Sequence, residues 1–131
     1  MTKYLIMGKL KVLFLSSACI YLMLGASISA AVEKSQIPVP GMVTMVDLGA
    51  KKCVPCKMMA PILDELKTEY ADRAAIIFID VWVEPAAGKK FGIRAIPTQI
   101  FFDAEGKEVG RHEGFLNKAS IVKELQNLGV K

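Results

Sequence analysis

The chain has 131 residues, the length of one domain, and its 17 Lys and Arg against 13 Asp and Glu give a formal net charge of +4. The excess of positive charge belongs to residues 1–31. Lys3, Lys9 and Lys11 lie there with no acidic residue, and the rest of the chain has 14 basic residues against 13 acidic ones. This distribution argues against nucleic-acid binding, which needs a basic cluster on the domain itself.

Residues 1–31 have the order of a targeting segment. Three lysines precede a charge-free apolar stretch, which small residues close at positions 29–31. The pattern is typical of a signal peptide with a small-x-small cleavage site. The alternative is an uncleaved membrane anchor, because the apolar run is almost long enough to span a bilayer. Either alternative predicts an exported domain in residues 42–131, with Cys19 only a small apolar side chain in the targeting segment.

The remaining elements follow in chain order from a Pro- and Gly-containing linker at residues 32–41. Short apolar runs at 43–48 and 75–80 predict buried strands. Residues 53–70 between them have apolar side chains at helical spacing, and Pro61 is expected to kink that helix. The last part of the chain predicts a short helix at 85–91, a hairpin of strands 98–102 and 107–112, and a helix from an N-cap at Asn117 to Gly129.

This order of elements predicts an α/β fold. The first two strands are joined by a helix and should be parallel neighbours. The last two strands should pair in the antiparallel direction. A mixed four-stranded sheet with helices on both faces would bury every apolar stripe.

Cys53 and Cys56 are separated by two residues at the predicted start of the helix over 53–70. Such thiols interconvert between a dithiol and a disulfide, and the helix N-terminus favours the thiolate of Cys53. A disulfide that closes so short a loop adds little stability, so redox chemistry is favoured over a structural role. The alternative is a soft sulfur pair for copper(I), with Met58 and Met59 beside it. The sequence offers it no second ligand cluster.

These motifs resemble those of the thioredoxin family over residues 41–129. The matching segments are Val46-Asp47-Leu48, Cys53-Val54-Pro55-Cys56-Lys57-Met58-Met59-Ala60-Pro61, Phe91-Gly92-Ile93-Arg94-Ala95-Ile96-Pro97-Thr98 and Gly114. The resemblance implies a thioredoxin fold in residues 42–131. It also implies thiol-disulfide exchange that uses a Cys53–Cys56 redox disulfide and needs no organic cofactor or metal.

Three residues are expected to carry the chemistry. Cys53 is the candidate nucleophile, and the more buried Cys56 is the resolving thiol that releases a mixed disulfide. Asp47 lies in an apolar run, and burial would raise its pKa and make it a usable base. The resemblance gives Asp47 the role of deprotonating Cys56 through a water. The alternative is a carboxylate at a strand end that faces solvent.

Four residues are expected to bind substrate. By resemblance, Pro97 should be a cis proline packed against the Cys53 sulfur, where it presents the backbone of Ile96 to an extended substrate segment. Gly114 would line the same groove. Pro55 lies between the cysteines, where a first-turn proline is tolerated.

The chain also departs from the family pattern. Lys52 and Gly49 stand where aromatic residues are common, which predicts a more basic and less aromatic groove. The family's buried lysine near Asp47 is assigned to Ile76. Trp82, the sole tryptophan, is expected to be a packing residue on the active-site side.

The sequence therefore predicts an exported enzyme that reduces protein disulfides in a bacterial periplasm. The Val54-Pro55 pair resembles that of reducing, membrane-tethered relatives that serve cytochrome maturation. A reductant in an oxidising compartment must be recharged, so the resemblance implies a membrane thiol electron donor. We expect a monomer. The alternatives are a disulfide oxidant or isomerase and, in a different class, a copper-handling or structural binding domain.

Overall fold

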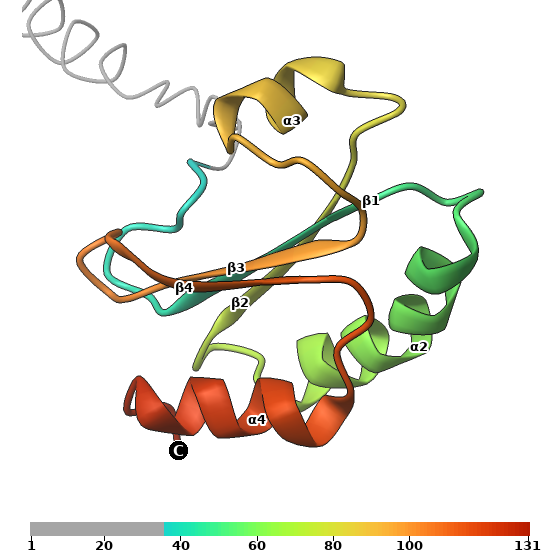
Figure 1. The fold of residues 1–131 in the computed structure, drawn as a ribbon. Coiled ribbons are helices and arrows are strands. Elements are labelled where there is room, and N and C mark those ends of the chain that lie inside the picture. The colour runs from blue at the N-terminus through green and yellow to red at the C-terminus, as the bar shows by residue number, and fades with distance from the viewer. Residues whose placement is uncertain (1–35) are drawn as a thin grey trace, which may run out of the picture. The chain divides into compact units, whose positions relative to one another are not determined.

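The computed structural model describes residues 36–131. The predicted targeting segment, Cys19 and the first residues of the predicted linker lie outside this range. The elements are β1 (Thr44–Gly49), α2 (Val54–Glu69), β2 (Ala75–Asp80), α3 (Pro85–Lys90), β3 (Thr98–Phe102), β4 (Glu108–Glu113) and α4 (Lys118–Asn127) (Figure 1). Every predicted strand and helix is present, and their order is the predicted one.

The four strands form one mixed sheet in the order β2-β1-β3-β4. β1 and β2 are parallel, whereas β3 is antiparallel to both β1 and β4. The prediction of two parallel neighbours joined by a helix, followed by a hairpin, is confirmed. β1 therefore lies inside the sheet, which explains why its six residues are all buried.

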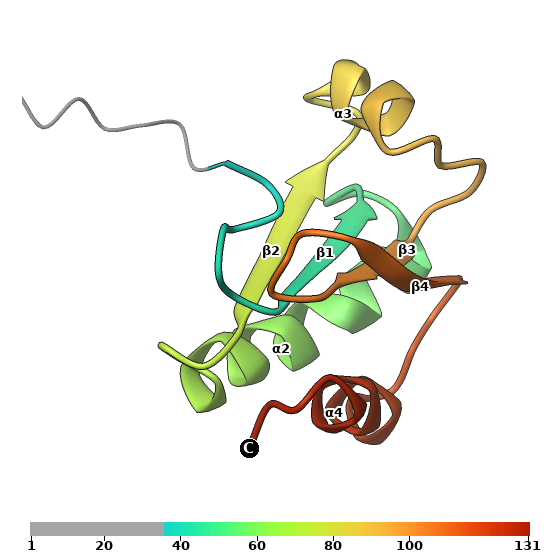
Figure 2. The same ribbon diagram turned by 90° about the vertical axis from the view of Figure 1, so that its left-hand side faces the viewer.

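Helices cover both faces of the sheet, as predicted (Figure 2). Alternation along the strands turns Met45 and Phe101 towards α2 and α4, whose buried residues complete that core. The alternate positions, among them Val46 and Ile100, face α3. The β1–α2 loop begins at the carboxyl end of β1 and leads into α2, which covers one face of the sheet.

Helix α2 is held by the apolar stripe that the sequence predicts. Met59, Leu63 and Leu66 are buried against the sheet, and each such side chain contributes about 1.5–3 kcal/mol to stability. Pro61 lies inside α2, which continues through it as one element to Glu69. Within residues 36–131, no helix is long and apolar enough to cross a membrane.

The described end of the predicted linker, residues 36–41, lies against the domain. Ile37 packs on the core beneath α3, and its carbonyl accepts a hydrogen bond from Lys90 Nζ at 3.3 Å. The Gly41 amide donates to the Ala104 carbonyl at 3.1 Å. These contacts join the approach to β1 to two other parts of the domain.

Candidate active site

A disulfide joins Cys53 and Cys56 at the N-terminus of α2, where their Cα atoms are 5.2 Å apart. Cys53 is the N-cap residue, and its Sγ accepts a hydrogen bond from the Cys56 amide at 3.4 Å. The amide and the positive end of the helix dipole both favour negative charge on that sulfur. Cys53 is partly exposed, whereas only 3% of Cys56 is exposed. An incoming disulfide therefore meets Cys53 first.

Asp47 lies in the middle of the sheet with no exposed surface. Burial raises its pKa from 3.8 to about 6, although a 2.7 Å hydrogen bond from Gln99 Nε2 to its Oδ1 acts in the opposite direction. The alternative of a solvent-facing carboxylate is thus excluded. Two residues further on the same strand face lies Gly49, where a Cβ would be 3.2 Å from Cys56 Sγ. Asp47 and Gly49 are therefore roughly 7 Å apart along β1, and Gly49 is the residue that lies against the resolving cysteine, Cys56.

Pro97 and Gly114 meet at the start of the β3–β4 hairpin. The Ile96–Pro97 peptide bond is cis, and the Gly114 amide donates to the Pro97 carbonyl at 2.8 Å. Gly114 has a φ of 97°, a conformation that favours glycine. Pro97 is buried, Ile96 is half-buried and Pro55 is exposed on the first turn of α2. The expected contact of Pro97 with the Cys53 sulfur and the substrate-binding roles of these residues stay predictions.

Comparison with known proteins decides the family. The thioredoxin family model matches residues 28–127. The thioredoxin of Mycobacterium tuberculosis is 37% identical over 103 residues, which cover 79% of this chain and 84% of that protein. The thioredoxin of Acidithiobacillus ferridurans is 39% identical over 101 residues, which cover 77% and 88% of the two chains. The chain belongs to the thioredoxin family.

Solved structures agree with this assignment. Chloroplastic thioredoxin z superimposes with a TM-score of 0.60 at 28% identity and covers 70% of this chain and 81% of its own. An exposed lipoprotein thioredoxin of Streptococcus pneumoniae shares the fold with a TM-score of 0.57 at 23% identity, over 66% and 85% of the two chains. This thioredoxin-family protein is a thiol-disulfide oxidoreductase with a Cys53–Cys56 disulfide.

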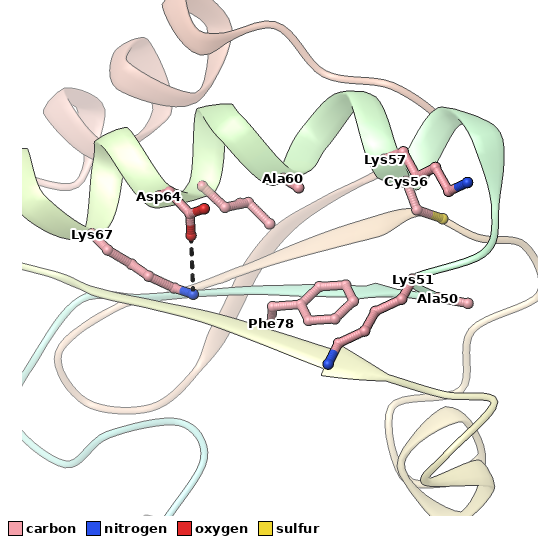
Figure 3. A pocket seen from close by; sticks show the side chains of 9 residues that line it. Ala50, Lys51, Cys56, Lys57, Ala60, Asp64, Lys67 and Phe78 are labelled. Atoms are coloured by element: carbon pink, nitrogen blue, oxygen red, sulfur yellow. Dashed lines mark ion pairs between the residues drawn. The ribbon is translucent and has the colours of Figure 1, made fainter.

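A cavity of about 190 Å³ lies between α2 and β2, beside the disulfide (Figure 3). Cys56 and Phe78 line it, and the Phe78 ring lies between α2 and the Lys51 side chain. Lys51, Lys57 and Lys67 also line the cavity, although Lys67 is 3.9 Å from Asp64 in an ion pair. The surface beside Cys56 is therefore apolar with a positive margin.

Two expectations about this thioredoxin were wrong. The β2 residue paired with Asp47 is Phe78, whereas Ile76 is paired with Met45, so Ile76 does not occupy the position beside the carboxyl group. Trp82 is not a packing residue, because 60% of it is exposed. It does lie on the expected side, because the Asp80 carboxylate accepts hydrogen bonds from both the Trp82 and Lys51 amides at 3.0 Å.

Sequence reasoning missed two residues of the site. Gln99 is fully buried and is the hydrogen-bond partner of Asp47. Its signal was an amide in a strand that is otherwise apolar after Thr98. Asp80 ties the β1–α2 loop to the β2–α3 loop, and these hydrogen bonds hold its pKa below the usual range, the Lys51 amide first among them. Its signal was a carboxylate at the end of a buried strand.

Proposed function

We propose that this thioredoxin reduces disulfides in other exported proteins. The observation that carries the proposal is the asymmetry of the redox pair, with Cys53 accessible at the positive end of α2 and Cys56 buried behind it. In the dithiol form, the Cys53 thiolate attacks a substrate disulfide, forms a mixed disulfide and releases one substrate thiolate. The Cys56 thiolate then attacks Cys53 Sγ, closes the Cys53–Cys56 disulfide and releases the second substrate thiolate.

The position of Asp47 supports its role as the base in the second step. The Cys56 thiol must lose its proton before it attacks, and a buried carboxylate with a pKa of about 6 is a suitable acceptor near neutral pH. Transfer through one water converts the Cys56 thiol and the carboxylate into a thiolate and a carboxylic acid. The acid later returns its proton, through water, to the released substrate thiolate.

The surface around the disulfide supports a protein substrate. We propose that Ile96, Pro97 and Gly114 form a substrate groove on one side of the redox pair; the Gly114 amide donates to the Pro97 carbonyl. Apolar side chains are exposed on the elements next to the disulfide, on the first turns of α2 and after β2; these are Val54, Met58, Trp82 and Val83. Together with the lysines at the cavity, this surface suits extended segments with apolar and acidic side chains.

The composition of residues 1–31 supports a periplasmic location, with the segment cleaved or kept as a membrane anchor. A reductant there depends on a membrane thiol electron donor, and we propose that the chain works as a monomer without an organic cofactor. Mass spectrometry of the mature N-terminus distinguishes cleavage from anchoring. A reporter enzyme fused after Lys131 and active only in the cytoplasm would contradict export.

The activity is tested by reduction of a disulfide-bonded protein such as insulin, with dithiothreitol as the electron source. We expect the chain to accelerate the reaction and the Cys53→Ser variant to be inactive. Among the described residues, no group of three or more His, Cys, Asp and Glu side chains is arranged to hold a metal ion. Stoichiometric copper in protein purified under reducing conditions, without disulfide reduction, would favour the copper-handling alternative.

A further inference from the structure

Asp47 and Gln99 form an isolated polar pair inside the sheet. They are direct partners in the antiparallel pairing of β1 and β3, so their side chains lie on the same face, beneath α2. Neither side chain has exposed surface. Gln99 Nε2 donates to Asp47 Oδ1 at 2.7 Å, while Asp47 Oδ2 and Gln99 Oε1 have no hydrogen-bond partner. A buried polar atom without a partner is costly, so the pair requires an explanation.

The two unpartnered atoms have the same chemistry. When Asp47 is ionised, both Asp47 Oδ2 and Gln99 Oε1 are acceptors, and neither can satisfy the other. When Asp47 carries a proton, the carboxyl group gains one donor, which the amide oxygen can accept. A lysine at the Gln99 position would only donate and would favour the carboxylate, whereas an apolar residue would do neither. A primary amide serves both forms of the acid.

We propose that Gln99 is a positioning residue that hydrogen-bonds Asp47 in both protonation states. It donates to the carboxylate and accepts from the carboxylic acid. Asp47 can then take the proton of the Cys56 thiol and later return it, and in each state a hydrogen bond joins the acid to the amide. This inference deepens the proposed function, because it rests on Asp47 as the base for Cys56.

The elements packed around this pair also carry ionisable groups. The residue opposite Asp47 on β2 is the uncharged Phe78. On the α2 side, Cys56, Lys57, Asp64 and Lys67 of α2 line the cavity beside Phe78, together with Lys51. Asp80 is paired with Gly49 at the end of β2. On the α4 side, Glu124 lines a cavity with Phe101 and with His112 of β4, which is paired with Gln99. His112 is exposed and lies two strands from Asp47, roughly 10 Å away. It is therefore the group that the experiment must control.

The pair is tested by nuclear magnetic resonance of the oxidised full chain, with the Asp47 ¹³Cγ shift followed against pH. In Gln99→Met both forms of Asp47 lose the amide, but the carboxylate loses the stronger, charge-assisted hydrogen bond, so we expect the titration midpoint to rise by about 1 pH unit. The acidic limb of the pH profile for insulin reduction should move upward with it. His112→Gln and Ile100→Val should leave the Asp47 midpoint unchanged; Ile100 is buried in β3 but faces α3.

A measurement on the unsubstituted protein covers the case in which Gln99→Met does not fold. The side-chain amide resonances of Gln99 should titrate with the same midpoint as Asp47. Gln99 resonances that ignore the Asp47 titration, or an Asp47 midpoint that Gln99→Met leaves unchanged, would overturn the inference. Both measurements use the disulfide form without substrate. Failure of insulin reduction would contradict the proposed function and leave this result standing.

Discussion

At the scale of single residues, the two sulfurs differ most in access. Cys53 caps α2 and is partly exposed, whereas Cys56 is buried in the first turn of the helix. The Cys56→Ser variant should therefore attack substrates through Cys53 and stop at the mixed disulfide, because no thiol is left to release the partner. Non-reducing electrophoresis followed by mass spectrometry should show covalent adducts with exported proteins.

Cys53→Ser is the matched control for this experiment. Its remaining thiol is buried, so we expect few adducts or none. Equal trapping by the two variants would contradict the assignment of Cys53 as the nucleophile.

The carboxyl group of Asp47 links stability to pH. Its pKa is 3.8 before folding and about 6 afterwards, so between these values the folded chain holds a proton that the unfolded chain has released. Stability therefore falls as pH rises through this interval and stays lower above it. Asp47→Asn removes the charge. We expect it to raise the free energy of unfolding by about 3 kcal/mol near pH ~8 and by little near pH ~3.5.

Urea unfolding of the oxidised protein at both pH values measures this difference. The Asn amide keeps an acceptor for Gln99 Nε2 and adds a donor for Gln99 Oε1, so Asp47→Asn mimics the protonated carboxyl group. A gain in stability at the acidic pH alone would have the wrong sign and would contradict a raised pKa.

The burial of Asp47 was foreseeable, but its partner was not. The apolar residues on both sides of Asp47 indicate a buried strand. In β3, however, all five residues are buried, so the sequence shows no alternation of polar and apolar residues that would indicate which side chains face α2. The assignment of Ile76 to the position beside Asp47 failed for a similar reason. The register between β1 and β2 cannot be read from either strand alone, and Ile76 and the true partner Phe78, two residues apart, lie on the same face of the sheet.

At the scale of elements, the Asp80 carboxylate joins two loops at the end of the sheet. Its Oδ2 accepts from the Lys51 amide, and its Oδ1 accepts from the Trp82 and Val83 amides at 3.0 and 3.3 Å. We expect Asp80→Ala to accelerate hydrogen exchange at these three amides, since they lose their acceptor. The exchange should be followed by nuclear magnetic resonance in the oxidised state.

Asp103→Ala provides the control for this change. The Asp103 carboxylate accepts from the Lys107 amide at 2.8 Å in the β3–β4 turn. Its loss should accelerate exchange at Lys107 and leave Lys51 unaffected. Unchanged exchange at Lys51 in Asp80→Ala would show that the loop is held by other contacts.

The elements themselves follow closely from local sequence. β1, β2 and β3 are short, mostly apolar runs, and the exposed β4 follows the turn after β3. Helix α4 begins after the predicted N-cap Asn117, whose Oδ1 accepts from the Ser120 amide at 2.9 Å. The contacts of residues 36–41 could not be predicted from the sequence, because Ile37 packs beside α3 on a core surface that forms only in the folded chain. The exposure of Trp82 was missed for a related reason: hydrophobicity predicts burial only where another element covers the side chain.

At the scale of the whole molecule, the fold brings two segments that are distant in sequence to one end of the sheet. The β1–α2 loop with the first turn of α2 supplies the redox pair, and the start of β3 supplies part of the expected groove (Figure 1). The scaffold therefore fixes the chemistry, whereas the direction of electron flow depends on how well the reduced pair is stabilised. A strong oxidant has a stabilised reduced form and a potential of about −120 mV, while thioredoxin has about −270 mV.

We expect this thioredoxin to have a potential in the reducing half of that range. The dipole of α2 and the nearby lysines favour the Cys53 thiolate, but Val54 and Pro55 add no donor or charge between the cysteines. Equilibration of the pair with glutathione measures the potential. Pro55→His should raise it by tens of mV, with each ~30 mV equal to about 1.4 kcal/mol, because an imidazolium stabilises the thiolate. Pro55→Ala controls for loss of the proline, and a parent potential near the oxidising end would make disulfide formation the activity.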